Sequence, residues 1–294
     1  MDFILGQSAS FLSTKDVFKL INLLSKSSSS SESSDIKKKI FEMITHISIK
    51  QEYPMYLINR SMSILKQMMS LTLNYSNLTT LPVEIGNLIA LTHLDLSHCK
   101  DLTALPDTIG NLTALMTLNL NSCFSLTALP DTIGNLTALT DLELRECEFL
   151  FALPDTIGNL TALTYMDLYG CTYLTALPDT IGMLTSLTSL ELYGCEIITT
   201  LPVGIGKLAA LTSLELYGCQ ALTSIPETIG NLTALTTLNL GKSSITVLPD
   251  KIGNLTALTN LHLQFCIFLT VLPDSIGNLT ALTSLDLESC FRLQ

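Results

Sequence analysis

One phrase recurs along the chain and constrains its fold more than any other feature. LPDTIGNLTAL begins at Leu105 and returns word for word at Leu129 and Leu153. Close variants of the phrase begin at Leu81, Leu177, Leu201, Ile225, Leu248 and Leu272. Successive starts are 24 residues apart, except for the step from Ile225 to Leu248, which is 23. A fixed period of this length is typical of a solenoid, in which similar units stack and each contacts its neighbours.

Each repeat holds a short L-x-L segment, which predicts a strand. The alternation points the two leucines into the core and the middle residue to the opposite face. The ten segments are Leu71/Leu73, Leu94/Leu96, Leu118/Leu120, Leu142/Leu144, Met166/Leu168, Leu190/Leu192, Leu214/Leu216, Leu238/Leu240, Leu261/Leu263 and Leu285/Leu287. One unit cannot bury its apolar side alone, so we expect about ten parallel strands to stack around a continuous core.

The residues between strands predict a short helical turn on the outer side. Proline has a fixed φ and no N–H, so Pro106 suits the start of such a turn. Ile109 and Leu112 then point back into the core, while Gly110 leaves room for close passage of the backbone. The expected fold is an α/β solenoid of 23–24-residue repeats, with the sheet on one face and the helical turns on the other.

These residues resemble the leucine-rich-repeat family. LTHLDLSHCKDLTALP, from Leu91 to Pro106, carries the family's L-x-x-L-x-L core. LPxxIGxL is similar to the subtype of plant intracellular immune receptors and Ras-group leucine-rich-repeat proteins. Over residues 61–294 the resemblance implies a horseshoe with a concave parallel sheet that contacts ligands and short helical turns on the convex face. It also implies protein binding, as in most members of the family, and no single enzymatic activity.

The first 60 residues differ in composition from the repeats. Apolar residues at helical spacing predict one helix from about Ser13 to Lys26 and a second from Asp35 to Ile49. The serine-rich segment 27–34 between them is typical of a flexible linker. We expect residues 1–60 to form a helical cap over the open end of the repeats, because terminal repeats need one. A separate recruiting module is the alternative.

The charge is distributed unevenly between these two parts. Residues 1–66 hold nine Lys/Arg and six Asp/Glu, whereas the remainder holds six and twenty. A repeat region with this excess of acidic residues disfavours nucleic acid and anionic membranes as partners. It favours a protein or peptide with basic residues. No apolar run reaches the roughly 18 residues of a membrane span, and the N-terminus lacks the basic start of a secretory signal. We therefore predict a cytoplasmic protein.

Cysteines form a column through the repeats, each three residues after the second strand leucine. They are Cys99, Cys123, Cys147, Cys171, Cys195, Cys219, Cys266 and Cys290. A thiol there is expected to face inward, as a small apolar group that donates weakly to a nearby carbonyl. Ser76 and Ser243 replace it in two turns that are one residue shorter. Because the column is a line and not a closed cluster, we expect no metal site and no cofactor.

An N-x-T sequon is copied along with the repeat. It occurs at Asn77, Asn111, Asn135, Asn159, Asn231, Asn254 and Asn278. In a secreted protein these asparagines would be candidates for glycosylation. An extracellular, glycosylated receptor or adhesion fragment is therefore the alternative to the cytoplasmic prediction.

Recognition is expected at the strand positions that vary between repeats. Four carboxylates occupy the middle of L-x-L in consecutive repeats, and like charges at about 5 Å repel by about 0.8 kcal/mol even in water. Tyrosines follow in three of these repeats, and tyrosine is enriched at binding hot spots. The candidate partner-binding residues are Glu143, Arg145, Tyr165, Asp167, Tyr169, Glu191, Tyr193, Glu215 and Tyr217. The alternative is that recent copying of one repeat reproduced ELYGC without selection on its surface.

Other chemistry has less support in the sequence. His93 and Asp95 share a strand face, but no nucleophile accompanies them, so we expect no catalytic residues and no enzyme. The acidic column is the one candidate for a divalent cation such as Ca²⁺. Beyond the last strand, Phe291 and Leu293 are expected to be exposed without a polar cap. This predicts either a truncated product or self-association through that end.

The sequence thus favours a non-catalytic protein–protein interaction module. The family resemblance implies a role in intracellular signalling or immune-type recognition.

Overall fold

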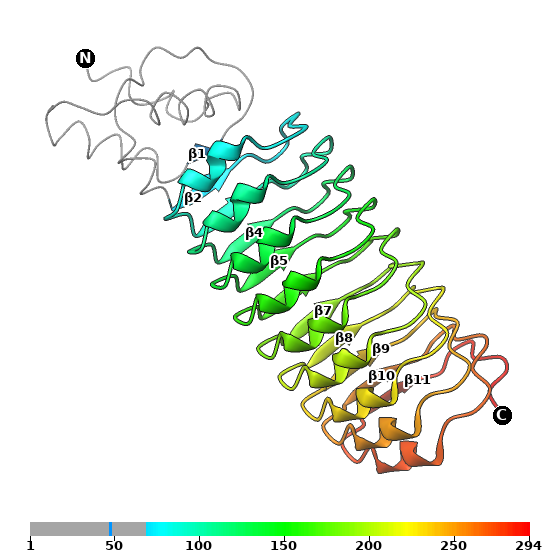
Figure 1. The fold of residues 1–294 in the computed structure, drawn as a ribbon. Coiled ribbons are helices and arrows are strands. Elements are labelled where there is room, and N and C mark those ends of the chain that lie inside the picture. Colours follow the sequence, from blue (N-terminus) through cyan, green and yellow to red (C-terminus); the bar gives the residue numbers. More distant parts are fainter. Residues whose placement is uncertain (1–46, 49–68) are drawn as a thin grey trace, which may run out of the picture.

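The computed structural model describes residues 47–48 and 69–294, whose strands form one open parallel sheet. The strands lie side by side in chain order along the molecule (Figure 1). They are β1 (Ile47–Ser48), β2 (Ser70–Thr72), β3 (His93–Asp95), β4 (Thr117–Asn119), β5 (Asp141–Glu143), β6 (Tyr165–Asp167), β7 (Ser189–Glu191), β8 (Ser213–Glu215), β9 (Thr237–Asn239), β10 (Asn260–His262) and β11 (Ser284–Asp286).

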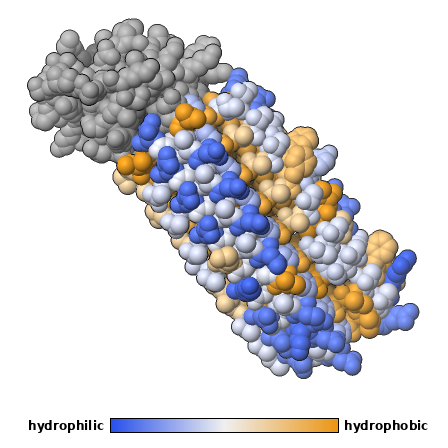
Figure 2. Space-filling view, viewed as in Figure 1, coloured by the Kyte–Doolittle hydropathy of each residue, from blue (hydrophilic) through white to orange (hydrophobic). Residues whose placement is uncertain are grey.

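The predicted helical turns are confirmed as five-residue 3-10 helices on the side opposite the sheet (Figure 1). They are η1 (Val83–Asn87), η2 (Asp107–Asn111), η3 (Asp131–Asn135), η4 (Asp155–Asn159), η5 (Asp179–Met183), η6 (Val203–Lys207), η7 (Glu227–Asn231), η8 (Asp250–Asn254) and η9 (Asp274–Asn278). The proline before each helix is extended, and its carbonyl begins the turn: Pro106 accepts the N–H of Ile109 at 2.9 Å. Figure 2 shows rows of hydrophilic side chains on this side of the molecule, beside an apolar band.

The ten strands predicted from L-x-L are all present, in the register that stacks their leucines. Leu94 pairs with Leu118, and Leu118 pairs with Leu142. These leucines are buried, together with the isoleucine and leucine of each 3-10 turn except near the C-terminal end. The core is therefore a continuous column inside the solenoid, as the repeat pattern predicts.

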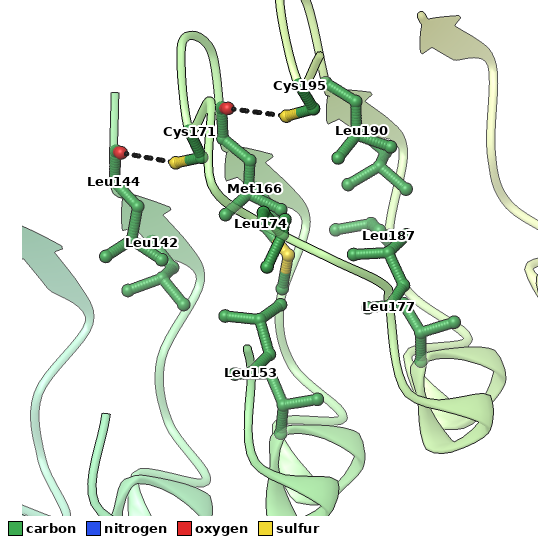
Figure 3. Close-up of a cluster of buried hydrophobic side chains, with 14 of the residues drawn as sticks. Leu142, Leu144, Leu153, Met166, Cys171, Leu174, Leu177, Leu187, Leu190 and Cys195 are labelled. Carbon is green, nitrogen blue, oxygen red and sulfur yellow. Dashed lines mark hydrogen bonds between the residues drawn. The ribbon is translucent and has the colours of Figure 1, made fainter. Parts of the chain in front are cut away.

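The cysteine column lies inside this core, where its predicted role is confirmed. Each thiol donates to the carbonyl oxygen of the second strand leucine in the preceding repeat; for Cys171 and Leu144 the S···O distance is 3.2 Å (Figure 3). The two short turns place Ser76 and Ser243 against the next thiol, at 3.2 Å from Cys99 and 3.5 Å from Cys266. All eight cysteines are free.

Two expectations need correction at the ends of the described chain. Ile47 and Ser48 form strand β1 and pair with β2, so the helix predicted to reach Ile49 does not include them. The rest of that helix, the first predicted helix and the serine linker lie outside the described residues. At the other end Phe291 is 82% exposed, as predicted, but Leu293 packs partly against the core.

No helix in residues 47–48 and 69–294 is both long and apolar enough to cross a membrane.

Candidate partner-binding face

The parallel register brings the four predicted carboxylates side by side on the sheet. Glu143 of β5 pairs with Asp167 of β6, which pairs with Glu191 of β7, which pairs with Glu215 of β8. Neighbouring strands lie about 4.8 Å apart, so each carboxylate has another within reach of strong repulsion. We call Glu143, Asp167, Glu191 and Glu215 the acidic ladder.

Local hydrogen bonds hold the members of the ladder in place. Asp167 is 7% exposed; its Oδ2 accepts the hydroxyl of Tyr165 at 3.2 Å and its Oδ1 accepts the N–H of Tyr169 at 2.9 Å. Glu143 accepts the amide N–H of Asn121 at 2.6 Å, and Glu191 accepts the hydroxyl of Ser189 at 2.8 Å.

Asp167 and Tyr165 are less accessible than the sequence interpretation expects. The carboxylate of Asp167 is buried and already bonded, so it is not a free contact for a partner. Tyr165 uses its hydroxyl within the protein and supports Asp167. The charge of Asp167 still contributes to the field of the face, while Glu143, Glu191 and Glu215 offer the accessible oxygens.

Burial, with a smaller contribution from neighbouring charges, raises pKa values on this face. Burial raises the pKa of Glu143, a rise opposed by its bond from Asn121 and reinforced by the charge of Asp167. Burial likewise raises the pKa of Glu191, with the bond from Ser189 opposing the rise and the charge of Glu215 adding to it. Burial and the neighbouring Asp167 raise the pKa of Tyr165 to about 12. A cation placed against this face would relieve the cost of the crowded charges.

Beside the ladder the predicted tyrosines stack face to face. The ring centroids of Tyr169 and Tyr193 are 4.6 Å apart, and those of Tyr193 and Tyr217 are 4.9 Å apart. The guanidinium carbon of Arg145 lies 3.9 Å from the centroid of Tyr169 and covers the free face of that ring. We call Arg145, Tyr169, Tyr193 and Tyr217 the tyrosine stack. Four side chains predicted separately thus form one continuous surface.

The backbone after each tyrosine explains why glycine follows it. Gly170, Gly194 and Gly218 have φ values of +70°, +72° and +78°, in the left-handed region that favours glycine. Other repeats place a non-glycine residue such as Glu146 or Lys242 at the same point, with φ of +58° and +56°. The turn shape is therefore common to the solenoid, and the glycines make it less costly where the tyrosines stack.

The face has the composition of a binding surface, with carboxylates beside aromatic rings. Among the described residues, no three or more His, Cys, Asp or Glu side chains are arranged to hold a metal ion. His93 is exposed, and its Nδ1 lies 2.8 Å from the hydroxyl of Thr92, in an open sheet that does not exclude water. The thiols are not available as nucleophiles, because burial raises their pKa values; that of Cys219 rises to about 12.

The sequence interpretation missed a second aromatic cluster, in the turns that follow the cysteines. Phe149 stacks on Tyr173 with ring centroids 5.2 Å apart, and Phe151 meets the same ring edge-on at 6.2 Å. These side chains are 43 to 47% exposed. The signal was present: large apolar residues stand at positions where other repeats have threonine, serine or alanine.

Comparison with known proteins identifies the architecture. A family model described as "Leucine-rich repeat region" matches residues 54–150 and 214–293. A search of curated proteins gave no match.

Among solved structures, a leucine-rich-repeat protein of Leptospira interrogans is 35% identical with a TM-score of 0.67, over 77% of this chain and 56% of that one. The chain thus spans little more than half of that protein. The leucine-rich repeat domain of the type III effector XopL is 25% identical with a TM-score of 0.66, covering 94% and 90% of the two chains. A TLR13–ssRNA13 complex is 27% identical with a TM-score of 0.60, covering 78% and 34%.

Proposed function

The chain belongs to the leucine-rich-repeat family, whose domains generally mediate protein–protein interaction, and we propose that it binds a basic segment of a partner protein on its concave face. The acidic ladder attracts lysine and arginine side chains, and the tyrosine stack supplies apolar contact beside them. Members of this family are typically non-catalytic scaffolds, and we propose the same for this chain.

One observation carries the proposal. The acidic ladder and the tyrosine stack occupy the same four repeats, β5 to β8, and run side by side. An acidic row alone lowers the stability of the fold, because neighbouring carboxylates repel one another. A stack of aromatic rings alone provides apolar contact area but no charged group to bind a cationic side chain. Together they match a chain that carries both cationic and apolar groups, because cations neutralise the ladder and also pack against aromatic rings.

The same charge argues against nucleic acid at this face. The TLR13 complex contains single-stranded RNA, so the fold itself is compatible with such a ligand. Phosphates need a basic surface, whereas Glu143, Glu191 and Glu215 present carboxylates here. A protein segment therefore fits the electrostatics better than a polyanion.

The test compares binding by the intact chain and by variants of the face. Short synthetic peptides that alternate lysine with apolar residues serve as probes, with glutamine replacing lysine in the control peptide. We expect the lysine peptides to bind and the variant Glu191→Lys/Tyr193→Ala to lose that binding. Glu148→Lys, at an exposed position in the turn after β5, is the matched charge control. Equal binding of the lysine peptides by both variants and the unmodified chain would refute the concave site.

The setting of this interaction is a further part of the proposal. By family resemblance we propose a cytoplasmic protein in signalling or immune-type recognition. The rival is a glycosylated extracellular protein, and one observation favours it: the sequon asparagines from Asn111 to Asn278 are exposed on the convex turns. Treatment of the protein from its natural source with a glycosidase, followed by mass measurement, separates the two. A loss of mass would establish the extracellular alternative.

Self-association through the last repeat, where Phe291 is exposed, is also proposed. Sedimentation that depends on concentration, and that Phe291→Ser abolishes, is the expected result. A monomer at all concentrations would contradict it.

A further inference from the structure

A notch lies beside the tyrosine stack, at the second of the two short turns. The step from Ile225 to Leu248 has lost one residue, and the missing residue belongs to the turn after β9, Lys242–Ile245. The turns on either side are of full length. Between them lies a hollow of about 430 Å³, lined by Tyr217, Gln220, Lys242, Ser243, Ser244, Phe265, Ile267 and Phe268. The segment from β8 to β10 that lines it is drawn in yellow to orange in Figure 1.

Large apolar side chains of the next repeat line one side of this hollow. Phe265, Ile267 and Phe268 of the next repeat are 41%, 43% and 38% exposed. In the short turn, Ser243 is buried against Cys266, and the hydroxyl of Ser244 donates to the carbonyl of Gln220 at 2.6 Å. Phe265, Ile267 and Phe268 thus form a partly exposed apolar wall beside this turn.

Tyr217 belongs to both features. It is the last ring of the tyrosine stack, because the next repeat has Gly241 where the previous three have tyrosine. A Cβ on Gly241 would lie 2.8 Å from the Tyr217 ring and 2.8 Å from the Gln264 side chain, so both side chains lean over that glycine. The stack thus leads directly to the rim of the notch.

Two cationic side chains lie beside the notch. From residue 67 onward the chain has only six Lys/Arg, and two of them lie here. Lys242 lines the notch, and the guanidinium of Arg292 lies 5.3 Å from the centroid of Phe268. A segment that is basic along the acidic ladder would meet cations at the notch, and only an acidic group is complementary there.

We propose that the notch receives an aromatic or large aliphatic side chain of the partner segment, with an acidic residue of that segment next to Lys242. This rests on the proposed function, since the same segment is held by the acidic ladder. A hollow with flat aromatic walls fits one such side chain, which would cover the exposed Phe265, Ile267 and Phe268.

The spacing of the repeats defines the motif that would fit. Strands lie about 4.8 Å apart and an extended chain advances about 3.3 Å per residue. The three steps of the acidic ladder therefore match about four residues of the partner, and the notch lies about two or three residues further on. The expected segment has alternating basic residues, followed at that distance by an aromatic residue with an acidic neighbour.

A library of random displayed peptides, selected on the full chain, is the probe. We expect selected peptides to combine basic residues with a following aromatic–acidic pair. In the filled variant, residues 242–245 are replaced by the five-residue turn 218–222 of the preceding repeat, which restores the 24-residue period. Selected peptides should bind this variant about tenfold more weakly or worse, because burial of one aromatic side chain contributes at least that much.

A second variant distinguishes loss of the notch from misfolding of the filled variant. Phe265→Asn removes one wall and suits the backbone there, because φ is +61° and asparagine tolerates the left-handed region. It should weaken the same peptides and leave thermal stability close to that of the unmodified chain. Lys242→Glu should reverse the preference for an acidic neighbour.

The outcomes separate the two proposals. Peptides selected for basic residues but indifferent to both notch variants would overturn the notch and keep the acidic ladder. Peptides that need the notch but bind Glu191→Lys/Tyr193→Ala equally well would overturn the concave site. Failure to select any peptide above background would count against both.

Discussion

At the scale of single residues, the carboxylates of the acidic ladder repel one another, and local hydrogen bonds partly offset that repulsion. Asp167 is buried with hydrogen bonds to both oxygens, and Glu143 and Glu191 each accept one bond from a neighbouring side chain. These bonds satisfy the oxygens but do not remove the repulsion between the charges. Burial raises the pKa values of Glu143 and Glu191, and the charge of a neighbouring carboxylate adds to the rise in each case.

The change Glu191→Gln should therefore stabilise the free protein at pH 7. The pKa of Glu191 is raised above its ordinary value of 4.5, so its contribution to stability is complete below pH 4.5 and is lost as pH rises through the folded-state pKa. Glutamine keeps an oxygen for the bond from Ser189 and carries no charge. Denaturant unfolding at pH 7 and at pH 5 should show a gain at pH 7 that shrinks at pH 5. Glu148→Gln is the exposed control, and an equal gain there would contradict the argument.

At the scale of the repeat element, the 3-10 turns pack so closely that only glycine fits at one position. A Cβ added to Gly134 would lie 2.5 Å from the carbonyl oxygen of Thr156 and 2.7 Å from its Cβ, in the neighbouring repeat. Backbone atoms of a stacked repeat cannot move away without shifting the repeat itself. The glycine of LPxxIGxL is therefore a packing residue and not a flexible joint.

Gly134→Ala should destabilise the protein by about 1–3 kcal/mol, the usual cost of overpacking a core. Gly277 provides a matched control in the same motif, because a Cβ there would have no atom within 4 Å. Gly277→Ala should be close to neutral. Chemical denaturation of the two variants measures the difference, and equal losses would show that the motif's glycine acts through its backbone alone.

At the glycine that follows each tyrosine, a substitution changes the backbone conformational energy without creating a steric clash. At Gly194 φ is +72°, and the nearest atoms to an added Cβ lie 3.8 Å away, which is ordinary contact. Gly194→Ala should cost about 1–2 kcal/mol, the penalty of the left-handed region for an L-residue. Ser289→Gly, at the equivalent position with φ of +59°, should stabilise instead. We expect thermal unfolding to show a lower stability for Gly194→Ala and a higher stability for Ser289→Gly. Changes in the same direction would refute the conformational explanation.

At the scale of the whole molecule, the cysteine column ties the repeats to one another through the core. Each thiol bonds to the strand of the preceding repeat, so the bonds run along the full length of the solenoid. Seven of the eight cysteines are buried, and burial raises the pKa of every thiol in the column. The fold thus keeps these groups protonated.

The consequence is a loss of stability in alkaline solution. Above the ordinary thiol pKa of 9.0 the unfolded chain releases protons that the folded chain retains. Stability should then fall by up to about 1.4 kcal/mol per pH unit for each buried thiol. Cys219→Ser should reduce the dependence of the unfolding free energy on pH by the contribution of one buried thiol. Denaturation measured from pH 8 to pH 10 tests the sign, and a flat profile would contradict it.

The repeat pattern was sufficient to predict the strands, the convex turns, the inward cysteines and the packing glycine. Each of these depends on local geometry that the period repeats, so one correct unit predicts its neighbours. The end of the predicted helix near Ile49 was wrong, because its apolar residues also suit a strand that extends the sheet at β1. The buried state of Asp167 was not predictable, since it depends on how Tyr165 and Tyr169 close around it.

The sequence by itself determined the solenoid, because a period of 23–24 residues with leucines at fixed positions leaves one way to bury them. It also determined which columns of residues lie on the concave face. Only the tertiary structure decided that Arg145 and three tyrosines form one stack, that Asp167 is buried, and that a notch lies beside the short turn after β9. The physical reason is that side-chain conformation and burial depend on neighbours one repeat away, whereas the repeat pattern depends on the chain alone.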